Sequence, residues 1–187
     1  MKVIFLDIDG VLNSTRSFIA NHPRSGQNPW KTMDERNIAT IDPIAVKLVN
    51  EVAHRCDAEI VVSSTHRKWF FVQTQTMQLG RHLDLPQLVE YMHNLGIEKD
   101  VIDATPILSS EGRVRGDEIA LWLSKNPQVE KYVILDDDSD MLDNQLNNFV
   151  HTDNFNGFSF YDFKQAVLIL GAKNEDENLS LTVPVRE

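Results

Sequence analysis

The sequence contains little cysteine and no long hydrophobic run. Its one cysteine, Cys56, excludes an intramolecular disulfide. No run approaches the roughly 20 apolar residues that a membrane-spanning helix needs, and the apolar residues before Asp7, residues 3–6, are too few for a signal peptide. We therefore expect a cytoplasmic protein that does not bind a membrane.

Positive charge is also scarce. The chain has 18 lysines and arginines against 28 aspartates and glutamates, which gives a formal net charge of -10. This balance disfavours non-specific binding to nucleic acid or to anionic lipid, although it leaves room for a local basic groove. The six histidines show no pair at metal-ligand spacing and have no cysteine partners, which argues against a zinc site.

Length and hydrophobic content are those of one compact domain. The chain has 187 residues, 42% of them hydrophobic, and no internal repeat or low-complexity tract. We assign residues 1–172 to a single domain and the polar, acidic residues 173–187 to a loose C-terminal tail. Residues 14–41, which contain prolines and glycine, are typical of a loop or small flap over the rim of a sheet.

Short β-branched runs alternate along the chain with longer amphipathic segments. Asp42 and Pro43 are typical of a helix start, and Gly96 and Gly171 are typical of helix ends. We expect strands at residues 3–6, 59–63, 100–103, 132–135 and 149–150. We expect helices at residues 43–53, 69–79, 85–95, 117–125 and 163–170. The alternation predicts an α/β fold, a Rossmann-like doubly wound parallel sheet of about five strands with helices on both faces.

Asp7 and Asp9 stand two residues apart where the first expected strand ends, and Gly10 follows them. Ligands bind at the carboxyl ends of the strands in parallel α/β folds, so these carboxylates are candidates for a site. Two like charges ~4 Å apart repel by about 4 kcal/mol at an effective dielectric constant of about 20, so their proximity calls for a cation or a proton. The alternative is an ordinary Asp-Gly turn between a strand and a helix.

Chemically useful residues also follow two further strands and one helix start. Ser63 ends the second expected strand, Asp136 and Asp137 follow the fourth, and Arg115 lies near the start of a helix. The carboxyl ends of a doubly wound sheet share one edge, so these side chains can converge with the first two acids. Mg²⁺ prefers hard oxygen ligands and often couples carboxylates to a substrate phosphate. The set therefore predicts a Mg²⁺ site for a phosphorylated substrate.

With these motifs the chain resembles the haloacid dehalogenase-like (HAD) superfamily of phosphotransferases. Residues 7–12 match its first motif, Ser63 its second, and Arg115 the lysine or arginine of its third. Asp136 and Asp137 match its fourth motif, and all four motifs occur in order on the expected elements. The resemblance covers most of the chain. Because the gaps that hold large HAD caps are short here or filled by core elements, it implies no large cap domain.

A narrower resemblance, to HAD domains associated with RNA-repair proteins, rests on five further segments. They are residues 41–43, 62–67, 104–106, 115–119 with 122–123, and 135–138. Many members of that group have a tryptophan before the arginine after the second motif, whereas His66 precedes Arg67 here. This likeness implies an activity in the repair of nucleic-acid ends.

The resemblance implies a covalent mechanism. Asp7 would attack phosphorus and form an aspartyl-phosphate, which water then hydrolyses. Asp9 would protonate the leaving oxygen and later take a proton from the attacking water. Mg²⁺ would be held by the Asp7 side chain, the Asp9 backbone carbonyl and Asp137, with Asp136 as the next candidate ligand.

The resemblance also implies the phosphate contacts. Ser63 would hydrogen-bond a phosphoryl oxygen, and Arg115 would balance the charge that develops during transfer. Ser64 and Gly10 are two further expected phosphate-binding residues.

Plainer interpretations stay open for several of these residues. Ser63 could be an ordinary strand-end hydroxyl, and Arg115 could pair with an acid of its own helix, with Arg113 as its rival. Asp138 and Asp140 are more typical of turn residues or helix caps than of ligands, because one Mg²⁺ takes few carboxylates from a protein.

An uncapped or lightly flapped site is open enough to admit the end of a polymer. Arg67 and Lys68 are the expected substrate-binding residues, with Trp30 as a stacking platform and Trp69 as a second candidate for stacking. The alternative is that the basic residues are ordinary surface charges and that the tryptophans belong to the core.

Together these observations favour a Mg²⁺-dependent phosphomonoesterase that acts on a nucleotide or on the terminal phosphate of a nucleic acid, as in RNA or DNA end repair. The alternative among enzymes is a small-metabolite phosphatase or a 5′-nucleotidase. The alternative from another class is a non-catalytic module of the same fold, against which the intact pair Asp7 and Asp9 counts. The expected partner is a phosphorylated substrate, and no obligate protein partner is evident.

Overall fold

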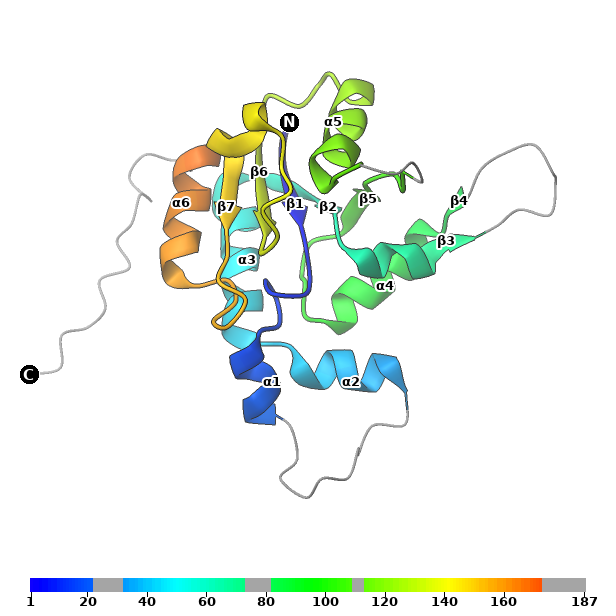
Figure 1. Cartoon of the computed structure of the whole chain (residues 1–187), viewed down its shortest axis with the longest axis vertical. Coiled ribbons are helices and arrows are strands. Elements are labelled where there is room, and N and C mark those ends of the chain that lie inside the picture. Colours follow the sequence, from blue (N-terminus) through cyan, green and yellow to red (C-terminus); the bar gives the residue numbers. More distant parts are fainter. Residues whose placement is uncertain (22–31, 73–81, 109–112, 173–187) are drawn as a thin grey trace, which may run out of the picture.

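A five-stranded parallel sheet forms the centre of the protein. The computed structural model describes residues 1–21, 32–72, 82–108 and 113–172. The strands are β1 (Lys2–Leu6), β2 (Ala58–Val62), β5 (Val101–Ala104), β6 (Lys131–Asp136) and β7 (Phe149–His151). Their order is β5-β2-β1-β6-β7, and every neighbouring pair is parallel (Figure 1). Each strand lies within one residue of its expected bounds, and the predicted sheet is confirmed.

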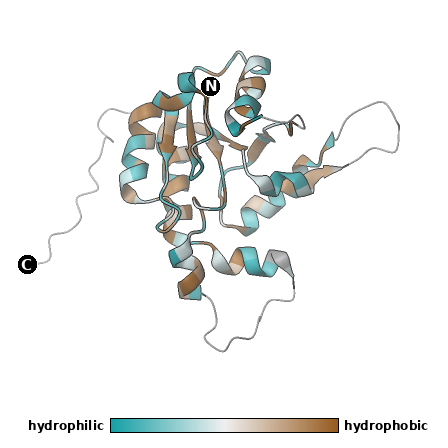
Figure 2. Ribbon diagram, viewed as in Figure 1, coloured by the Kyte–Doolittle hydropathy of each residue, from teal (hydrophilic) through white to brown (hydrophobic). Residues whose placement is uncertain are grey.

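Helices cover both faces of the sheet, as predicted. They are α3 (Pro43–Cys56), α4 (Leu85–Asn94), α5 (Arg115–Lys125) and α6 (Phe160–Leu170). Because side chains alternate along a strand, Ile4 and Leu6 of β1 face the core under α3, α4 and α6. Val3 and Phe5 face the second core, under α5. Figure 2 shows the resulting contrast between hydrophobic strands and helices with hydrophilic outer faces.

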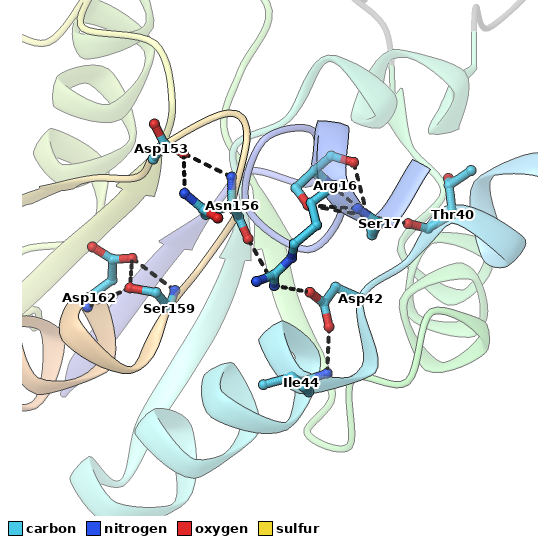
Figure 3. Close-up of polar contacts among 10 residues, drawn as sticks. Arg16, Ser17, Thr40, Asp42, Ile44, Asp153, Asn156, Ser159 and Asp162 are labelled. Atoms are coloured by element: carbon cyan, nitrogen blue, oxygen red, sulfur yellow. Dashed lines mark hydrogen bonds and ion pairs between the residues drawn. The ribbon is translucent and has the colours of Figure 1, made fainter. Parts of the chain in front are cut away.

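The helix boundaries follow their capping residues. Asp42 caps α3, because its Oδ1 accepts a hydrogen bond from the Ile44 N–H at 2.8 Å. Ser159 and Asp162 form a reciprocal capping box at the start of α6 (Figure 3). Gly171 ends the same helix with a φ of 72°, a left-handed conformation that favours glycine.

The helix predicted at residues 69–79 is wrong in its described part. A 3₁₀ helix, η1 (Thr65–Phe70), is followed by β3 (Phe71–Val72), which pairs antiparallel with β4 (His82–Leu83). Ser64 starts the 3₁₀ turn, since its side chain accepts from the His66 N–H. Aromatic and β-branched residues then follow, and these favour extended backbone over helix. Residues 73–81 lie outside the described ranges.

The segment 14–41, predicted as a loop or small flap, contains two helices, α1 (Thr15–Asn21) and α2 (Met33–Thr40), which together are called the flap below. Residues 22–31, which include Trp30, lie outside the described ranges. Ser17 Oγ donates to the Thr40 carbonyl at 2.8 Å, which joins α1 to α2. Arg16 Nη2 lies 2.8 Å from Asp42 Oδ2, which joins α1 to the start of α3 (Figure 3). The flap is therefore tied to the sheet edge by side-chain contacts.

The two remaining sequence observations concern the thiol and the membrane. Cys56 is fully buried at the end of α3, and burial raises the pKa of its thiol. Every helix in the described ranges is too short or too polar to span a lipid bilayer. The predicted tail, residues 173–187, lies outside the described ranges.

Candidate active site

The hydrogen-bond ladder of the sheet continues one residue past the ends of the central strands. The Asp7 N–H donates to the Leu135 carbonyl of β6 at 3.0 Å. The Ser63 N–H donates to the Leu6 carbonyl, the last in β1, at 2.9 Å. The Thr105 N–H donates to the last β2 carbonyl at 2.9 Å. These bonds fix the backbones of Asp7, Ser63 and Thr105 along the carboxyl edge of the sheet, where ligands bind in such folds.

Three carboxylates gather at this edge. Asp7, Asp136 and Asp137 each offer one oxygen, and these oxygens lie within 4.8 Å of one another. Asp7 is 5% exposed and Asp136 is fully buried. Burial raises the pKa of Asp7. Burial, with a smaller contribution from the charge of Asp7, raises the pKa of Asp136 to about 8. The bare protein therefore does not stabilise the full negative charge of this cluster, and Asp136 keeps a proton at neutral pH.

Arg115 faces this cluster from the first residue of α5. Its side chain is 9% exposed, and Nη1 lies 4.0 Å from Asp136 Oδ2, which is too long for a direct hydrogen bond. Within the described residues, these two atoms are the buried side-chain atoms without a hydrogen-bond partner. Buried polar atoms normally have a hydrogen-bond partner. The two unpaired atoms therefore indicate a place for a polar ligand that bonds to each of them.

The donor set fits Mg²⁺. A divalent cation would give Asp136 Oδ2 a partner, and its charge would offset the burial that raises the pKa of Asp7 and Asp136. All three side chains supply carboxylate oxygens, which are the ligands that Mg²⁺ prefers. A phosphoryl oxygen would be a partner for Arg115 Nη1. The cluster and the arginine together are chemically suited to a metal ion and a phosphate.

The other acids of this loop have structural contacts. The Asp138 N–H donates to Asp136 Oδ1 at 3.0 Å, which orients that carboxylate, while the Asp138 side chain is exposed. Asp140 Oδ2 accepts from the Arg115 N–H at 2.9 Å, at the start of α5. Asp140 thus serves the helix start, as the sequence favoured, and its contact helps to place Arg115.

Asp9 points away from the cluster of three carboxylates. Its Oδ1 accepts from Asn13 Nδ2 at 2.7 Å, and its Oδ2 lies 3.1 Å from His66 Nε2. His66 Nδ1 in turn lies 2.8 Å from the Tyr91 hydroxyl. The hydrogen bond from His66 holds the pKa of Asp9 below its usual range. Asp9 is therefore a carboxylate in a fixed orientation at the mouth of the site.

Gly10 lets Asp137 approach the loop that follows β1, called the first loop below. Gly10 has a φ of 69°, and a Cβ added there would lie 2.1 Å from Asp137 Cγ. A side chain at this position would be strained and would displace the carboxylate. Asn154 Nδ2 donates to Asp137 Oδ2 at 2.6 Å from the loop after β7. Asp137 is thus held between the first loop and the loop after β7.

The two serines after β2 are both buried. Ser63 Oγ lies 3.4 Å from Thr105 Oγ1, and Ser63 is 1% exposed. The Ser64 hydroxyl hydrogen-bonds the Asp7 carboxylate, which partly offsets the effect of burial on the Asp7 pKa. Ser64 therefore contacts the predicted nucleophile, and Ser63 lies beside it at the strand end.

The structure contradicts the prediction that Arg67 contacts substrate. Arg67 is 1% exposed and pairs with Glu118 of α5. Its Nε donates to the Thr105 carbonyl at 2.9 Å, and its guanidinium also donates to the carbonyls of Ser64 and Pro106. The alternative that Glu118 pairs with Arg115 is also wrong, because Glu118 is engaged by Arg67. Arg67 joins η1 to α5 inside the protein.

The other two predicted substrate-binding residues are Lys68 and Trp30. Lys68 is exposed on η1 and is not among the residues that line the cavity beside Asp9. Trp30 lies outside the described ranges.

The sequence interpretation missed the residues that orient the motif acids. Asn13 and His66 hold Asp9, Tyr91 holds His66, and Asn154 holds Asp137. Two signals were available: Asn13 follows Asp9 by four residues in a tight loop, and His66 stands where the related domains often have tryptophan. Tyr91 and Asn154 carry no local signal, because their roles depend on how α4 and the loop after β7 pack.

The buried position of Arg67 predicts a large loss of stability on its removal. Arg67→Ala would leave Glu118, whose side chain is 13% exposed, without its ion-pair partner. We expect a cost of about 3–5 kcal/mol in the free energy of unfolding, measured by urea titration. The exposed neighbour provides the control, because Lys68→Ala should change stability by about 0.5 kcal/mol or less. Equal effects of the two substitutions would contradict the structural role.

The pKa of Asp136 predicts how pH affects Mg²⁺ binding. Folding raises this pKa from 3.8 to about 8, so the folded protein keeps a proton that the unfolded chain loses. The free energy of unfolding of the metal-free protein should therefore fall as pH rises through that window. Mg²⁺ competes with the proton, so the rise in melting temperature caused by Mg²⁺ should be larger near about pH 8.5 than near about pH 6.

Two variants isolate this effect. Asp136→Asn should weaken both the pH slope and the Mg²⁺-induced shift in scanning calorimetry, because the amide does not titrate. Asp138→Asn, in the same loop but exposed, should retain both. A Mg²⁺ shift that is unchanged in Asp136→Asn would show that this carboxylate does not take part in the metal site.

Comparison with known proteins agrees with this geometry. The family model of the HAD domain in Swiss Army Knife RNA repair proteins matches residues 3–163. The matched span includes all five strands of the parallel sheet, the acid cluster and Arg115. No curated protein and no solved structure matches the chain. Since the family model covers well over half of the sequence, the chain belongs to the family of HAD domains found in Swiss Army Knife RNA repair proteins.

Proposed function

We propose that this domain is a Mg²⁺-dependent phosphomonoesterase that acts through an aspartyl-phosphate on a nucleotide or a nucleic-acid terminal phosphate. The observation that carries the proposal is the meeting of Asp7, Asp136 and Asp137 with Arg115 at one edge of the sheet. Membership of a family of RNA-repair domains supports a phosphorylated nucleic acid as the substrate.

Asp7 is the proposed nucleophile. One of its oxygens accepts from the Ile8 N–H at 2.8 Å, and the Ser64 hydroxyl also bonds the carboxylate, so the group has a fixed orientation. In the first step a bond forms between a carboxylate oxygen and phosphorus while the bond from phosphorus to the leaving oxygen breaks. Water then attacks the aspartyl-phosphate, which releases phosphate and restores Asp7.

Mg²⁺ would be bound by the Asp7 side chain, the Asp9 backbone carbonyl and Asp137, with Asp136 beside them. When bound, it offsets the repulsion between the anionic nucleophile and the phosphate. Gly10 and Asn154 serve this set, because they keep the Asp137 carboxylate close to the first loop.

Asp9 is the proposed general acid and base. It lies beside the nucleophile in sequence, points away from the acid cluster and is oriented by His66 and Asn13. Its lowered pKa makes it a carboxylate in the free protein, which is the form that takes a proton from the attacking water. A bound phosphate brings negative charge to Asp9 and favours the protonated form, which then donates to the leaving oxygen.

Arg115 and the serines are the proposed phosphate contacts. The unpaired Nη1 of Arg115 is available to a phosphoryl oxygen, and the buried position of the guanidinium strengthens that interaction. Ser63 and Ser64, at the end of β2, complete the proposed phosphate site. Gly10, which the sequence also suggested, is already engaged, because its N–H donates to Asn13 Oδ1 at 3.0 Å and its carbonyl accepts from Thr152 Oγ1 at 2.9 Å. Arg113 is exposed, which favours Arg115 over its rival.

The nearest competing function is that of a small-metabolite phosphatase or a 5′-nucleotidase, which would use the same chemistry on another leaving group. A non-catalytic module is the competitor from another class. A module that only binds a partner needs neither buried acids with raised pKa nor an unpaired buried arginine atom, since each of these costs stability.

Replacement of the nucleophile tests the chemistry. Asp7→Asn should lower the turnover of a generic aryl phosphate by about 10³-fold or more, because the amide cannot form the acyl-phosphate bond. A chelator should remove the activity of the wild type, and added Mg²⁺ should restore it. Asp100→Asn is the control and should retain turnover, because Asp100 precedes β5 and so lies at the edge of the sheet opposite the carboxyl edge. Equal residual turnover of Asp7→Asn and wild type would remove the assignment.

A panel of substrates tests the leaving group. Oligonucleotides with a 3′-phosphate, oligonucleotides with a 5′-phosphate, mononucleotides and sugar phosphates are compared by kcat/KM in the presence of Mg²⁺. We expect the best nucleotide or strand end to exceed sugar phosphates by about tenfold or more, a ratio typical of one stacked base. A clear preference for sugar phosphates would exclude the nucleic-acid version of the proposal.

A further inference from the structure

A cavity of about 430 Å³ opens beside Asp9, between the flap and η1. Its volume is in the range of about 300–1,000 Å³ that small-molecule sites occupy. Asp9 and Gly10 form one end, Phe18 and Arg36 of the flap line one side, and His66 and Trp69 of η1 line another. The cavity thus lies beside the proposed general acid, which must reach the leaving oxygen of the substrate. The leaving group therefore has room in this cavity.

The η1 side of the cavity is a fixed aromatic surface. The Trp69 ring stacks on His66 with centroids 4.5 Å apart and an angle of 29°, and its edge meets Tyr91 at 6.2 Å. Trp69 is nevertheless 49% exposed. Exposure of a large ring that two neighbours already hold in place is typical of a surface on which a flat ligand stacks.

The flap side adds a second ring and a positive charge. The Arg36 guanidinium lies 5.5 Å from the Phe18 ring centre, and both residues line the cavity. Among the twelve described residues that line it, Asp9 is the one acid and Arg36 the one lysine or arginine. In a chain with a net charge of -10, an arginine at this place favours an anionic ligand. The remaining walls carry amides and hydroxyls, such as those of Asn37 and Thr40, which can bond the edge of a base or a sugar hydroxyl.

We propose that this cavity binds the terminal nucleoside of the substrate, with the base stacked on Trp69 and the sugar beside Asp9. The inference rests on the proposed function, because it takes the phosphate to lie at Asp7. Asp9 contacts His66, and His66 stacks on Trp69, so the route from the phosphate to the base runs through the space next to Asp9. A sugar phosphate without a base would leave the aromatic surface unused. The nucleoside can belong to a free nucleotide or to a strand end.

Equilibrium binding separates this inference from the chemistry. Adenosine 3′-monophosphate, adenosine 5′-monophosphate and ribose 5-phosphate are titrated by calorimetry into Asp7→Asn with Mg²⁺, so that turnover does not interfere. We expect at least one nucleotide to bind about tenfold or more tightly than ribose 5-phosphate, the gain typical of one stacked base. Equal affinities for nucleotide and ribose phosphate, or no binding of either, would overturn the inference.

Variants of Trp69 identify the surface responsible. When Trp69→Ala is combined with Asp7→Asn, most of the nucleotide preference should be lost. Trp69→Phe, which keeps a ring, should retain most of it. Tyr161→Ala, which removes an exposed ring on α6 that does not line the cavity, is the matched control and should change nothing. A preference that survives Trp69→Ala would contradict the stacking role. If the wild type does not hydrolyse the aryl phosphate but still prefers nucleotides in binding, the proposed function is refuted and the nucleoside site is not.

A terminally phosphorylated trinucleotide distinguishes the two sources of the nucleoside. If the occupant is a strand end, the trinucleotide should bind more tightly than the mononucleotide, and Arg36→Gln should reduce that difference because the charge no longer faces the next phosphate. If the occupant is a free nucleotide, the mononucleotide should bind at least as tightly. In either case Trp69→Ala should weaken the ligand that binds more tightly, and an unchanged affinity in that variant would overturn the inference.

Discussion

The burial of neighbouring carboxylates is the constraint on which this site depends. Asp7 and Asp136 end neighbouring central strands, so the parallel register places their side chains together whatever else the chain does. The pKa of each is raised because burial removes the water that would stabilise the charge. Arg115 lies close enough to reduce this cost but does not form a direct bond with Asp136. The protein thus keeps an arrangement that the proposed cation and phosphate would complete.

The surrounding structure holds the acids in different orientations. Asp137 is kept near the first loop by the absence of a side chain at Gly10 and by the amide of Asn154. Asp9 is turned outward by Asn13 and His66. Two carboxylates from one short motif therefore have opposite surroundings, one buried with a raised pKa and one outward-facing with a lowered pKa. Such a division separates a nucleophile from a proton-transfer group.

Much of the fold could be predicted from sequence, because apolar runs and capping residues act locally. The five strands and the helices after Asp42 and before Gly171 follow from such signals. The helix predicted at residues 69–79 was wrong because the Ser64 cap and the β-branched and aromatic residues after it favour a 3₁₀ turn and a strand. The motif acids were found because each follows a strand. The role of Arg67 was missed because its partner, Glu118, lies 51 positions away on α5, and no local pattern connects them.

Anomalous diffraction from crystals grown with Mn²⁺ in place of Mg²⁺ would test the shared cation most directly. We predict one strong peak in contact with carboxylate oxygens of both Asp7 and Asp137, close to Asp136 and on the Arg115 side of the sheet edge. A peak bound instead to the exposed acids Asp138 and Asp140 would contradict a cation shared by the cluster. The absence of a peak among the carboxylates of Asp7, Asp136 and Asp137 would contradict it as well.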